Sequence, residues 1–402
     1  MPSSFSWMDY SDRDRRRVLE VIDLFREEDT RDELGIGVIR DAFADRLFPG
    51  TSTIQTRVRY FLFIPWVFQM GDGGVSSFAD KIRWRLDLLR KSLVKGEEET
   101  GVIGYRAKAA VQRLPSSVYW QGLKKWGILR FDGSETDYYR FVSRQQAADA
   151  PMLNDDGEVV GFSAAMLWHP RLPEPPTGWR DATTFALTRE EAVFLAERIR
   201  QSASQSLLAW LIDQDGEPAE NTNFVWEQVA PKQLPEYLVE TFLNARHFSE
   251  FIHGAALLYN LMLAEEKEWN EKTAHYEHEI AGWWHLLQSQ GWDLKAWGPE
   301  RLWDLMRDWK VAVPRGCSVF VESWLHDIGK CRSAEEVIHA PRFRELIRSR
   351  EKNIKRGRAR LGNRRALDNW SGTSGTAQLD YRWRSPVRAL VRDVIRGLRV
   401  EV

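Results

Sequence analysis

The stretch Asp29–Trp66 reads DTRDELGIGVIRDAFADRLFPGTSTIQTRVRYFLFIPW and holds the strongest local structural signals of the chain. Four apolar residues in it repeat at helical spacing, and these are Ile36, Ile39, Phe43 and Leu47. Pro49 and Gly50 then mark a turn, and a second apolar stripe follows. We therefore predict two helices with a tight joint, the second of them capped by the hydroxyl of Thr51 or Ser52.

Polar groups at this joint have a second interpretation. The hydroxyls of Thr51 and Ser52 and the guanidinium of Arg57 could contact the phosphate backbone of a nucleic acid. The alternative is a capped core helix with ordinary polar cover, because Ser and Thr are common at helix starts for capping alone.

The composition limits the class of protein. The chain has 402 residues, 43% of them hydrophobic, a net charge of −1 and only two cysteines. We expect a sizeable core, no disulfide framework and no zinc site. No signal-peptide pattern and no apolar run of about 18 residues occurs, so we expect a soluble cytoplasmic protein without a membrane segment. The 19 tryptophans are expected to fill the core, with base stacking as the alternative.

Apolar periodicity along the chain predicts a mostly α, multi-helical protein. Residues 1–150 form an N-terminal helical domain in this prediction, and residues 151–181, which hold five prolines, form a linker. Residues 182–340 form a C-terminal helical domain, and a basic segment follows at 341–402.

Two capping boxes predict helix starts, one from Ser11 and Asp14 and one from Thr188 and Glu191. Basic residues cluster near the first of these starts, and they are Arg13, Arg15, Arg16 and Arg17. They could pair with the acidic run Glu27–Asp29 or bind phosphate groups.

Residues 102–142 contain the order of elements found in a winged helix. A helix, a proline break and a second helix are followed by two short strand patterns at 128–131 and 138–142. Lys124 and Lys125 would face outward from the second helix, where a groove-reading helix carries its contacts. The N-terminal half is therefore expected to hold a small winged-helix subdomain. The alternative is an α+β subdomain used only in packing.

His326 and Asp327 resemble the adjacent pair of HD-domain phosphohydrolases, which helps to hold a divalent metal in a helical fold. A complete site needs another histidine, for which His278 is a candidate, and an aspartate further along the chain. The pair is short and a chance match is easy, so metal-dependent hydrolysis is an alternative function rather than the leading one.

Arg342–Arg365 is the most strongly charged segment. It has eleven basic and two acidic residues, a balance of +9 in 24 residues. Arginine predominates, as expected where phosphate groups are bound through paired hydrogen bonds. We expect phosphate-backbone contacts from Arg348, Lys352, Lys355, Arg356, Arg358, Arg360, Arg364 and Arg365. The alternatives are a solvated helix paired with acidic residues and a docking surface for an acidic partner subunit.

Several blocks of the chain resemble a bacterial family of unknown function. They are SFSWMDYS at Ser4–Ser11, the stretch Asp29–Trp66, FLNARHFSEFIHGAALLYNLMLAE at Phe242–Glu265 and GTSGTAQLDYRW at Gly372–Trp383. The resemblance covers nearly the whole chain. It implies an association with phage-defence loci, in which members are encoded near helicases and phospholipase-D-like nucleases. It assigns no catalytic residues.

These observations lead to a functional hypothesis. No Walker A motif, no GxSxG and no zinc-binding spacing occurs, so we expect no cofactor and lean towards a protein that is not an enzyme. We predict a non-catalytic nucleic-acid-binding or adaptor subunit of a bacterial antiphage defence system, acting with a helicase or nuclease partner. An HD-type metal-dependent phosphohydrolase and a protein–protein scaffold are the alternatives.

Overall fold

The computed structural model describes residues 32–70, 77–105, 113–148, 152–153, 159–160, 164–291 and 297–401. Helices dominate these residues, as the periodicity predicts, and β1 (Met152–Leu153) and β2 (Val159–Val160) form one short antiparallel pair. None of the helices in these ranges is long and apolar enough to cross a membrane. The helix start predicted at Ser11 and the arginines beside it lie outside the described residues.

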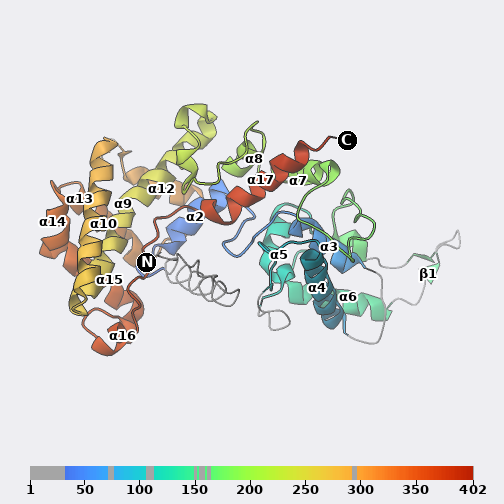
Figure 1. Cartoon of the computed structure of the whole chain (residues 1–402), viewed down its shortest axis with the longest axis horizontal. Coiled ribbons are helices and arrows are strands. Elements are labelled where there is room, and N and C mark those ends of the chain that lie inside the picture. Colours follow the sequence, from blue (N-terminus) through green and yellow to red (C-terminus); the bar gives the residue numbers. More distant parts are fainter. Residues whose placement is uncertain are drawn as a thin grey trace, which may run out of the picture. The chain divides into compact units, whose positions relative to one another are not determined.

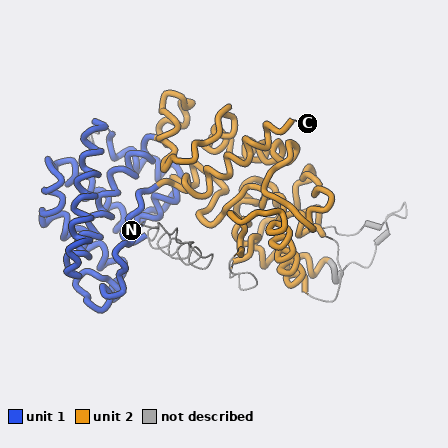
Figure 2. The backbone as a smooth tube through the Cα atoms, in the orientation of Figure 1, with its two compact units in different colours: residues 1–42, 243–379 blue, residues 43–242, 380–402 orange. Residues whose placement is uncertain are grey.

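The chain divides into two compact units, each of which is built from two separate parts of the sequence (Figure 2). Unit 1 comprises residues 1–42 and 243–379, and unit 2 comprises residues 43–242 and 380–402. Each unit therefore closes only when segments far apart in the sequence meet.

Unit 2 is organised around α3 (Tyr60–Gln69), in which every residue from Tyr60 to Phe68 is buried. A helix that is apolar on every side is stable only when neighbours cover it all round. The neighbours that contact it include α4 (Phe78–Lys95) and α5 (Pro115–Lys125), as Figure 1 shows. The aromatic run of the sequence therefore lies at the centre of this core.

The C-terminal helix α17 (Arg388–Leu398) packs against α7 (Arg189–Ser202) and α8 (Leu207–Ile212). This packing needs a small residue, because a Cβ added at Gly397 would lie 2.7 Å from the Cβ of Ala192. α7 begins with the predicted capping box, in which the Thr188 hydroxyl accepts a hydrogen bond from Glu191 N at 3.2 Å. The other elements of unit 2 are α6 (Glu135–Ala148), η2 (Ala164–Leu167), η3 (Val225–Glu227), η4 (Pro231–Gln233) and η6 (Trp383–Val387).

Unit 1 contains most of the long helix α9 (Glu236–Glu266) and the helices that follow it as far as residue 379. The apolar face of α9 is buried, and it consists of Phe248, Phe251, Ile252, Ala255, Leu258 and Met262. The buried indoles of Trp283 and Trp324 donate to main-chain carbonyls of α9, at 2.7 and 2.9 Å. These tryptophans fill the core and find one polar partner each, as expected for buried indoles.

Further helices complete unit 1 after α9, and α13 packs against α15. They are α10 (Asn270–Ser289), α12 (Glu300–Asp308), α13 (Arg315–Ile328), α14 (Ala334–His339), α15 (Pro341–Lys355), η5 (Arg356–Arg358) and α16 (Arg364–Asp368). α2 (Gly37–Leu47) confirms the first predicted helix, and the division between the units falls inside it. The domain boundary predicted at 151–181 lies within unit 2 and stays a prediction.

The predicted wing at 128–131 and 138–142 is wrong. Residues 138–142 lie in the helix α6, and the first strand pattern amounts to one isolated bridge between Leu129 and Trp168. The helix forms because Ser134 caps it: the Ser134 hydroxyl accepts from Asp137 N at 3.1 Å, and Ser134 N donates to the Asp137 carboxylate at 3.1 Å. This S-x-x-D pattern is visible in the sequence and outweighs the aromatic strand propensity.

The predicted cap at Thr51 or Ser52 is also wrong. α3 begins at Tyr60, and no side chain caps it. The Thr51 hydroxyl instead donates to the carbonyl of Phe48 at 2.7 Å, which closes the end of α2. The side chain of Gln55 fastens the following turn through Ser52 N and the carbonyl of Gly50. A Ser or Thr hydroxyl can accept from a free N–H group at a helix start or donate to a carbonyl at a helix end. The residue type alone therefore does not decide which end it binds.

Candidate nucleic-acid interface

The basic segment Arg342–Arg365 occupies α15, η5 and α16 of unit 1. Six of its cations form polar contacts within the unit, and we refer to them as the inner cations: Arg342, Arg344, Arg348, Arg350, Lys355 and Arg360. The other five are exposed, and we refer to them as the outer cations: Lys352, Arg356, Arg358, Arg364 and Arg365.

The inner cations on α15 meet carboxylates or carbonyls that lie elsewhere in the sequence. Arg342 donates to Glu336 at 2.6 Å, and Arg344 pairs with Glu265. Arg348 lies 3.6 Å from Glu266 on α9. The guanidinium of Arg350 donates to three main-chain carbonyls, those of Leu34, Gly35 and Gly316, at 2.8, 2.9 and 2.7 Å.

A groove of about 470 Å³ lies at the start of α15 and is lined partly by these arginines. Its lining residues are His339, Pro341, Arg342, Arg344, Glu345 and Arg348. The groove is not an open anion site, because each of its three guanidinium groups already pairs with a glutamate.

Lys355 and Arg360 take part in a buried polar network around Glu351, whose exposed fraction is 0%. Glu351 accepts hydrogen bonds from the Tyr259 hydroxyl at 2.6 Å and from Lys355 Nζ at 3.0 Å. Glu33, from the other part of unit 1, pairs with Lys355 and lies 3.2 Å from Arg360.

Both carboxylates of this network are held ionised. Burial acts to raise the pKa of Glu351, but hydrogen bonds from Tyr259 and from two main-chain N–H groups lower it below its usual value. Burial likewise acts to raise the pKa of Glu33, and the contacts with Lys355 and Ser374 lower it overall. Lys355 and Arg360 are therefore neutralised inside the unit at pH 7.

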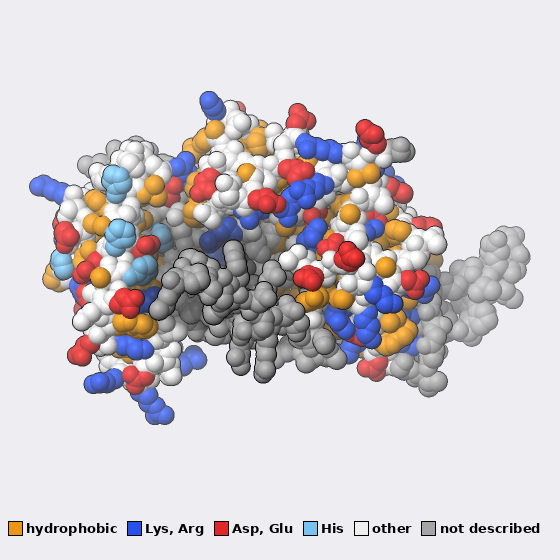
Figure 3. All heavy atoms as spheres, in the orientation of Figure 1, with side chains coloured by type: hydrophobic (Ala, Val, Ile, Leu, Met, Phe, Trp, Pro, Cys, Tyr) orange, Lys and Arg blue, Asp and Glu red, His pale blue; other side chains and the backbone are white. Residues whose placement is uncertain are grey.

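The outer cations have a different environment. Within the described ranges, none of their side chains forms an ion pair or a hydrogen bond. Gly357 lies between Arg356 and Arg358, and a Cβ added there would meet nothing within 4 Å. Lys and Arg side chains project from the end of unit 1 where Figure 1 labels α16, as Figure 3 shows. Lys352 lies in the last turn of α15 and Arg356 directly follows that helix, where the helix dipole favours positive charge.

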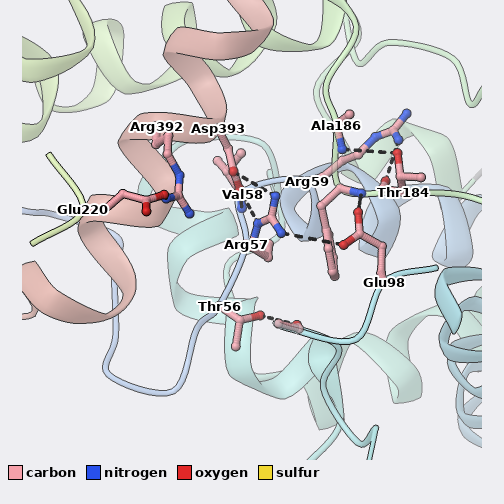
Figure 4. A network of polar contacts seen from close by, with 12 residues as sticks. Thr56, Arg57, Val58, Arg59, Glu98, Thr184, Ala186, Glu220, Arg392 and Asp393 are labelled. Atoms are coloured by element: carbon pink, nitrogen blue, oxygen red, sulfur yellow. Dashed lines mark hydrogen bonds and ion pairs between the residues drawn. The ribbon is translucent and has the colours of Figure 1, made fainter. Parts of the chain in front are cut away.

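The candidates at the anchor stretch lie in unit 2, where Thr51 and Arg57 are engaged and the Ser52 hydroxyl is buried without a hydrogen-bond partner in the described residues. Thr51 is buried. Arg57 donates to Asp393 on α17 through Nε at 2.8 Å and through a terminal nitrogen at 3.0 Å, and it lies 3.9 Å from Glu98 (Figure 4). Burial raises the pKa of Asp393, although Arg57 acts to lower it. Arg57 is thus the partner of a buried carboxylate and ties residues 56–58 to the C-terminal helix.

The remaining candidates on α5 sit at its last turn. Lys124 is half-buried and lies 3.0 Å from Asp132, while Lys125 is exposed. Because Asp132 is fully exposed, water screens this pair strongly. Lys124 and Lys125 belong to unit 2, whereas the outer cations belong to unit 1.

The HD pair lies on α13, where His326 is exposed and contacts Lys330. His278 is exposed on α10. Throughout the residues that the structure describes, no group of three or more His, Cys, Asp or Glu side chains could hold a metal ion. The side chains named for the alternative metal site are therefore not assembled into one.

The sequence interpretation missed Glu33 and Glu351, which organise the basic segment. The spacing of Glu351 and Lys355, four residues apart on a helix, is a visible signal for an ion pair. The role of Glu33 has no such signal, because 318 positions separate it from Glu351 in the sequence.

The comparisons with known proteins bear only on the family of the chain. No curated protein and no solved structure matches the chain. A family model does match, over residues 2–394. The chain belongs to DUF6361, a family of unknown function.

Proposed function

We propose that this protein binds nucleic acid through the phosphate backbone and is a non-catalytic subunit or adaptor in a bacterial antiphage defence system, beside a helicase or nuclease. The defence context comes from the family resemblance alone. The nucleic-acid contact has its own support in the chemistry of unit 1.

The observation that carries the proposal is the set of outer cations. An arginine or lysine already paired with a carboxylate has little attraction left for phosphate, whereas an exposed unpaired one keeps its full charge. Five such side chains lie within residues 352–365. The net charge of the whole chain is −1, so attraction to a polyanion must come from a local patch of this kind.

The test is fluorescence anisotropy with labelled single- and double-stranded DNA and RNA, titrated with salt from about 50 to 200 mM. For the unmodified protein we expect log K to fall linearly with log salt at a slope of roughly −3 or steeper. Replacing all five outer cations by Gln should flatten the slope strongly, by about 0.9 for each duplex phosphate that the variant no longer neutralises.

A matched control removes the same amount of charge from paired positions. Arg140, Arg200, Arg301, Arg307 and Arg396 are exposed and each pairs with a nearby carboxylate. Their replacement by Gln should leave the slope nearly unchanged. Equal flattening in both variants would show that only net charge matters, and absence of binding even near 50 mM salt would reject the proposal. Recovery of an acidic protein on the unmodified chain, but not on the outer-cation variant, would then identify a docking surface.

A further inference from the structure

The loop that carries Arg356 and Arg358 is held by carboxylates on its inner side. Glu351 accepts from Arg360 N through one oxygen and from Leu361 N through the other, both at 2.9 Å. Glu266 accepts from the next main-chain donor, Gly362 N, at 2.7 Å. Three successive N–H groups are therefore bound by acidic side chains of the same unit.

The other end of the loop is fastened to the same carboxylate. Lys355, the last residue of α15, lies 3.0 Å from Glu351. The next residue, Arg356, has φ 52° and ψ −122°, a conformation that a non-glycine residue rarely adopts. A strained residue persists only where its surroundings hold it in place. Glu351 contacts the chain on both sides of this residue and supplies that restraint.

If only their charge mattered, Glu351 and Glu266 would weaken phosphate binding. A negative charge beneath a basic surface lowers the positive potential that attracts a polyanion. Its removal should then strengthen binding. A role in holding the loop predicts the reverse, because a loop that samples many conformations must be ordered at the moment of binding.

We propose that Glu351 is a positioning residue for phosphate binding: it fixes residues 356–361 so that Arg356 and Arg358 flank Gly357 with the open side facing the ligand. This inference rests on the proposed function. Tyr259 supports the same arrangement, because its hydroxyl donates to Glu351 at 2.6 Å and lies 2.7 Å from Lys355 Nζ.

The first experiment compares Glu351→Gln with Glu345→Gln by anisotropy at several salt concentrations. Glu345 is exposed on the same helix, so its replacement removes the same charge without touching the loop. Glu345→Gln should leave affinity unchanged or raise it slightly. Glu351→Gln should lower affinity by about 3- to 10-fold, the factor that corresponds to the net value of one hydrogen bond, with a flatter salt slope.

The second measurement needs no nucleic acid. Trypsin cleaves after Arg356 and Arg358, and mass spectrometry of the native protein gives the rate at these two bonds. We expect Glu351→Gln to speed cleavage there several-fold, Glu345→Gln to leave it unchanged, and the charge-neutral Tyr259→Phe to have a smaller effect in the same direction. If Glu351→Gln does not fold, both measurements are made on Tyr259→Phe instead.

The outcomes separate the two proposals. If the unmodified protein binds no nucleic acid, the proposed function fails, whatever the proteolysis shows. If it binds and Glu351→Gln behaves like Glu345→Gln in both measurements, the proposed function stands and the positioning role is overturned.

Discussion

The inner and outer cations lie on one continuous segment and share their residue types. They differ in whether a carboxylate or carbonyl of unit 1 already binds them. Inner Lys355 and Arg360 are neutralised by Glu33 and Glu351 inside unit 1. Outer Arg358, between them in the sequence, is exposed and has no ion-pair partner in the described part of the chain. A charge count along a sequence therefore overstates the positive charge that is available to a ligand, because about half of this segment's cations already form polar contacts within unit 1.

The comparison assigns different consequences to substitutions in the two groups. Changes among the inner cations and their carboxylates should act mainly on the free energy of unfolding, and Glu351 alone among them should also act on binding, through the position of residues 356–361. Changes among the outer cations should act on the free energy of nucleic-acid binding. Each prediction below can break that separation.

The largest effect is expected from Glu351→Ala. The change removes one of the two carboxylate partners of Lys355 and leaves two main-chain N–H groups, those of Arg360 and Leu361, without their acceptor. Removal of one partner from a buried charged network costs about 3 kcal/mol or more. Urea unfolding measures the change, and a loss below about 1 kcal/mol would contradict the structural role of the network.

The second prediction contrasts Glu351 with Glu250, a buried carboxylate on α9 that has fewer donors. Glu250 lies 3.0 Å from Arg246, and its second oxygen is buried with no hydrogen-bond partner in the described residues. Burial raises its pKa to about 7, although Arg246 acts to lower it.

The folded state therefore binds a proton more tightly than the unfolded state, and stability falls as the pH rises from about 4.5 to about 7. Glu250→Gln should remove a penalty of about 3 kcal/mol at pH 8 and of less than about 1 kcal/mol at pH 5. The pH dependence of stability has the opposite sign for Glu351. Because its pKa is lowered, its contribution to stability is present above pH 4.5 and is lost as the pH falls below that value. Urea unfolding of the unmodified protein and of Glu250→Gln at pH 5 and pH 8 measures this difference in the free energy of unfolding. A Glu250→Gln variant equally affected at both values would show that this carboxylate does not titrate in that range.

The third prediction pairs one residue from each group. Arg350→Ala removes three hydrogen bonds to carbonyls and should cost about 1–2 kcal/mol of stability with little effect on the salt slope. Arg358→Ala should leave the urea midpoint unchanged and flatten the salt slope by about 0.9 if it contacts a duplex phosphate. Exchange of these two results would reverse the assignment of inner and outer groups.

The smallest effect is expected from Arg342→Gln. Arg342 is an inner cation by its contact with Glu336, yet the two side chains are 41% and 35% exposed. Exposed pairs contribute little to stability because water screens them. We expect no measurable shift of the urea midpoint and less than a twofold change, by the same anisotropy titration, in nucleic-acid affinity. A larger loss of affinity would move Arg342 into the outer group.

Some of the fold was predictable because its signals are local. The helix at α2, the amphipathic α4 and the capping box of α7 follow from spacing within a few residues. The error at 138–142 arose within the same range, because the strand prediction rested on the aromatic residues and overlooked the Ser134–Asp137 cap. That region was decided by a local signal that the strand prediction did not weigh.

The candidate site was predictable only as a segment. Arginine content located Arg342–Arg365, and all five outer cations were among the residues expected to contact phosphate. The partners of Arg57 and Arg360 lie 336 and 327 positions away along the chain. No pattern within a window of neighbouring residues identifies such partners.

The sequence by itself determined the helical class, the helix α2 and the location of the basic segment, because helix periodicity and charge are local properties of the chain. Tertiary structure decided which cations remain available. Burial makes an unpaired charge costly, so Glu33 and Glu351 take up the cations that folding brings beside them, and only those left facing solvent keep their charge for a ligand.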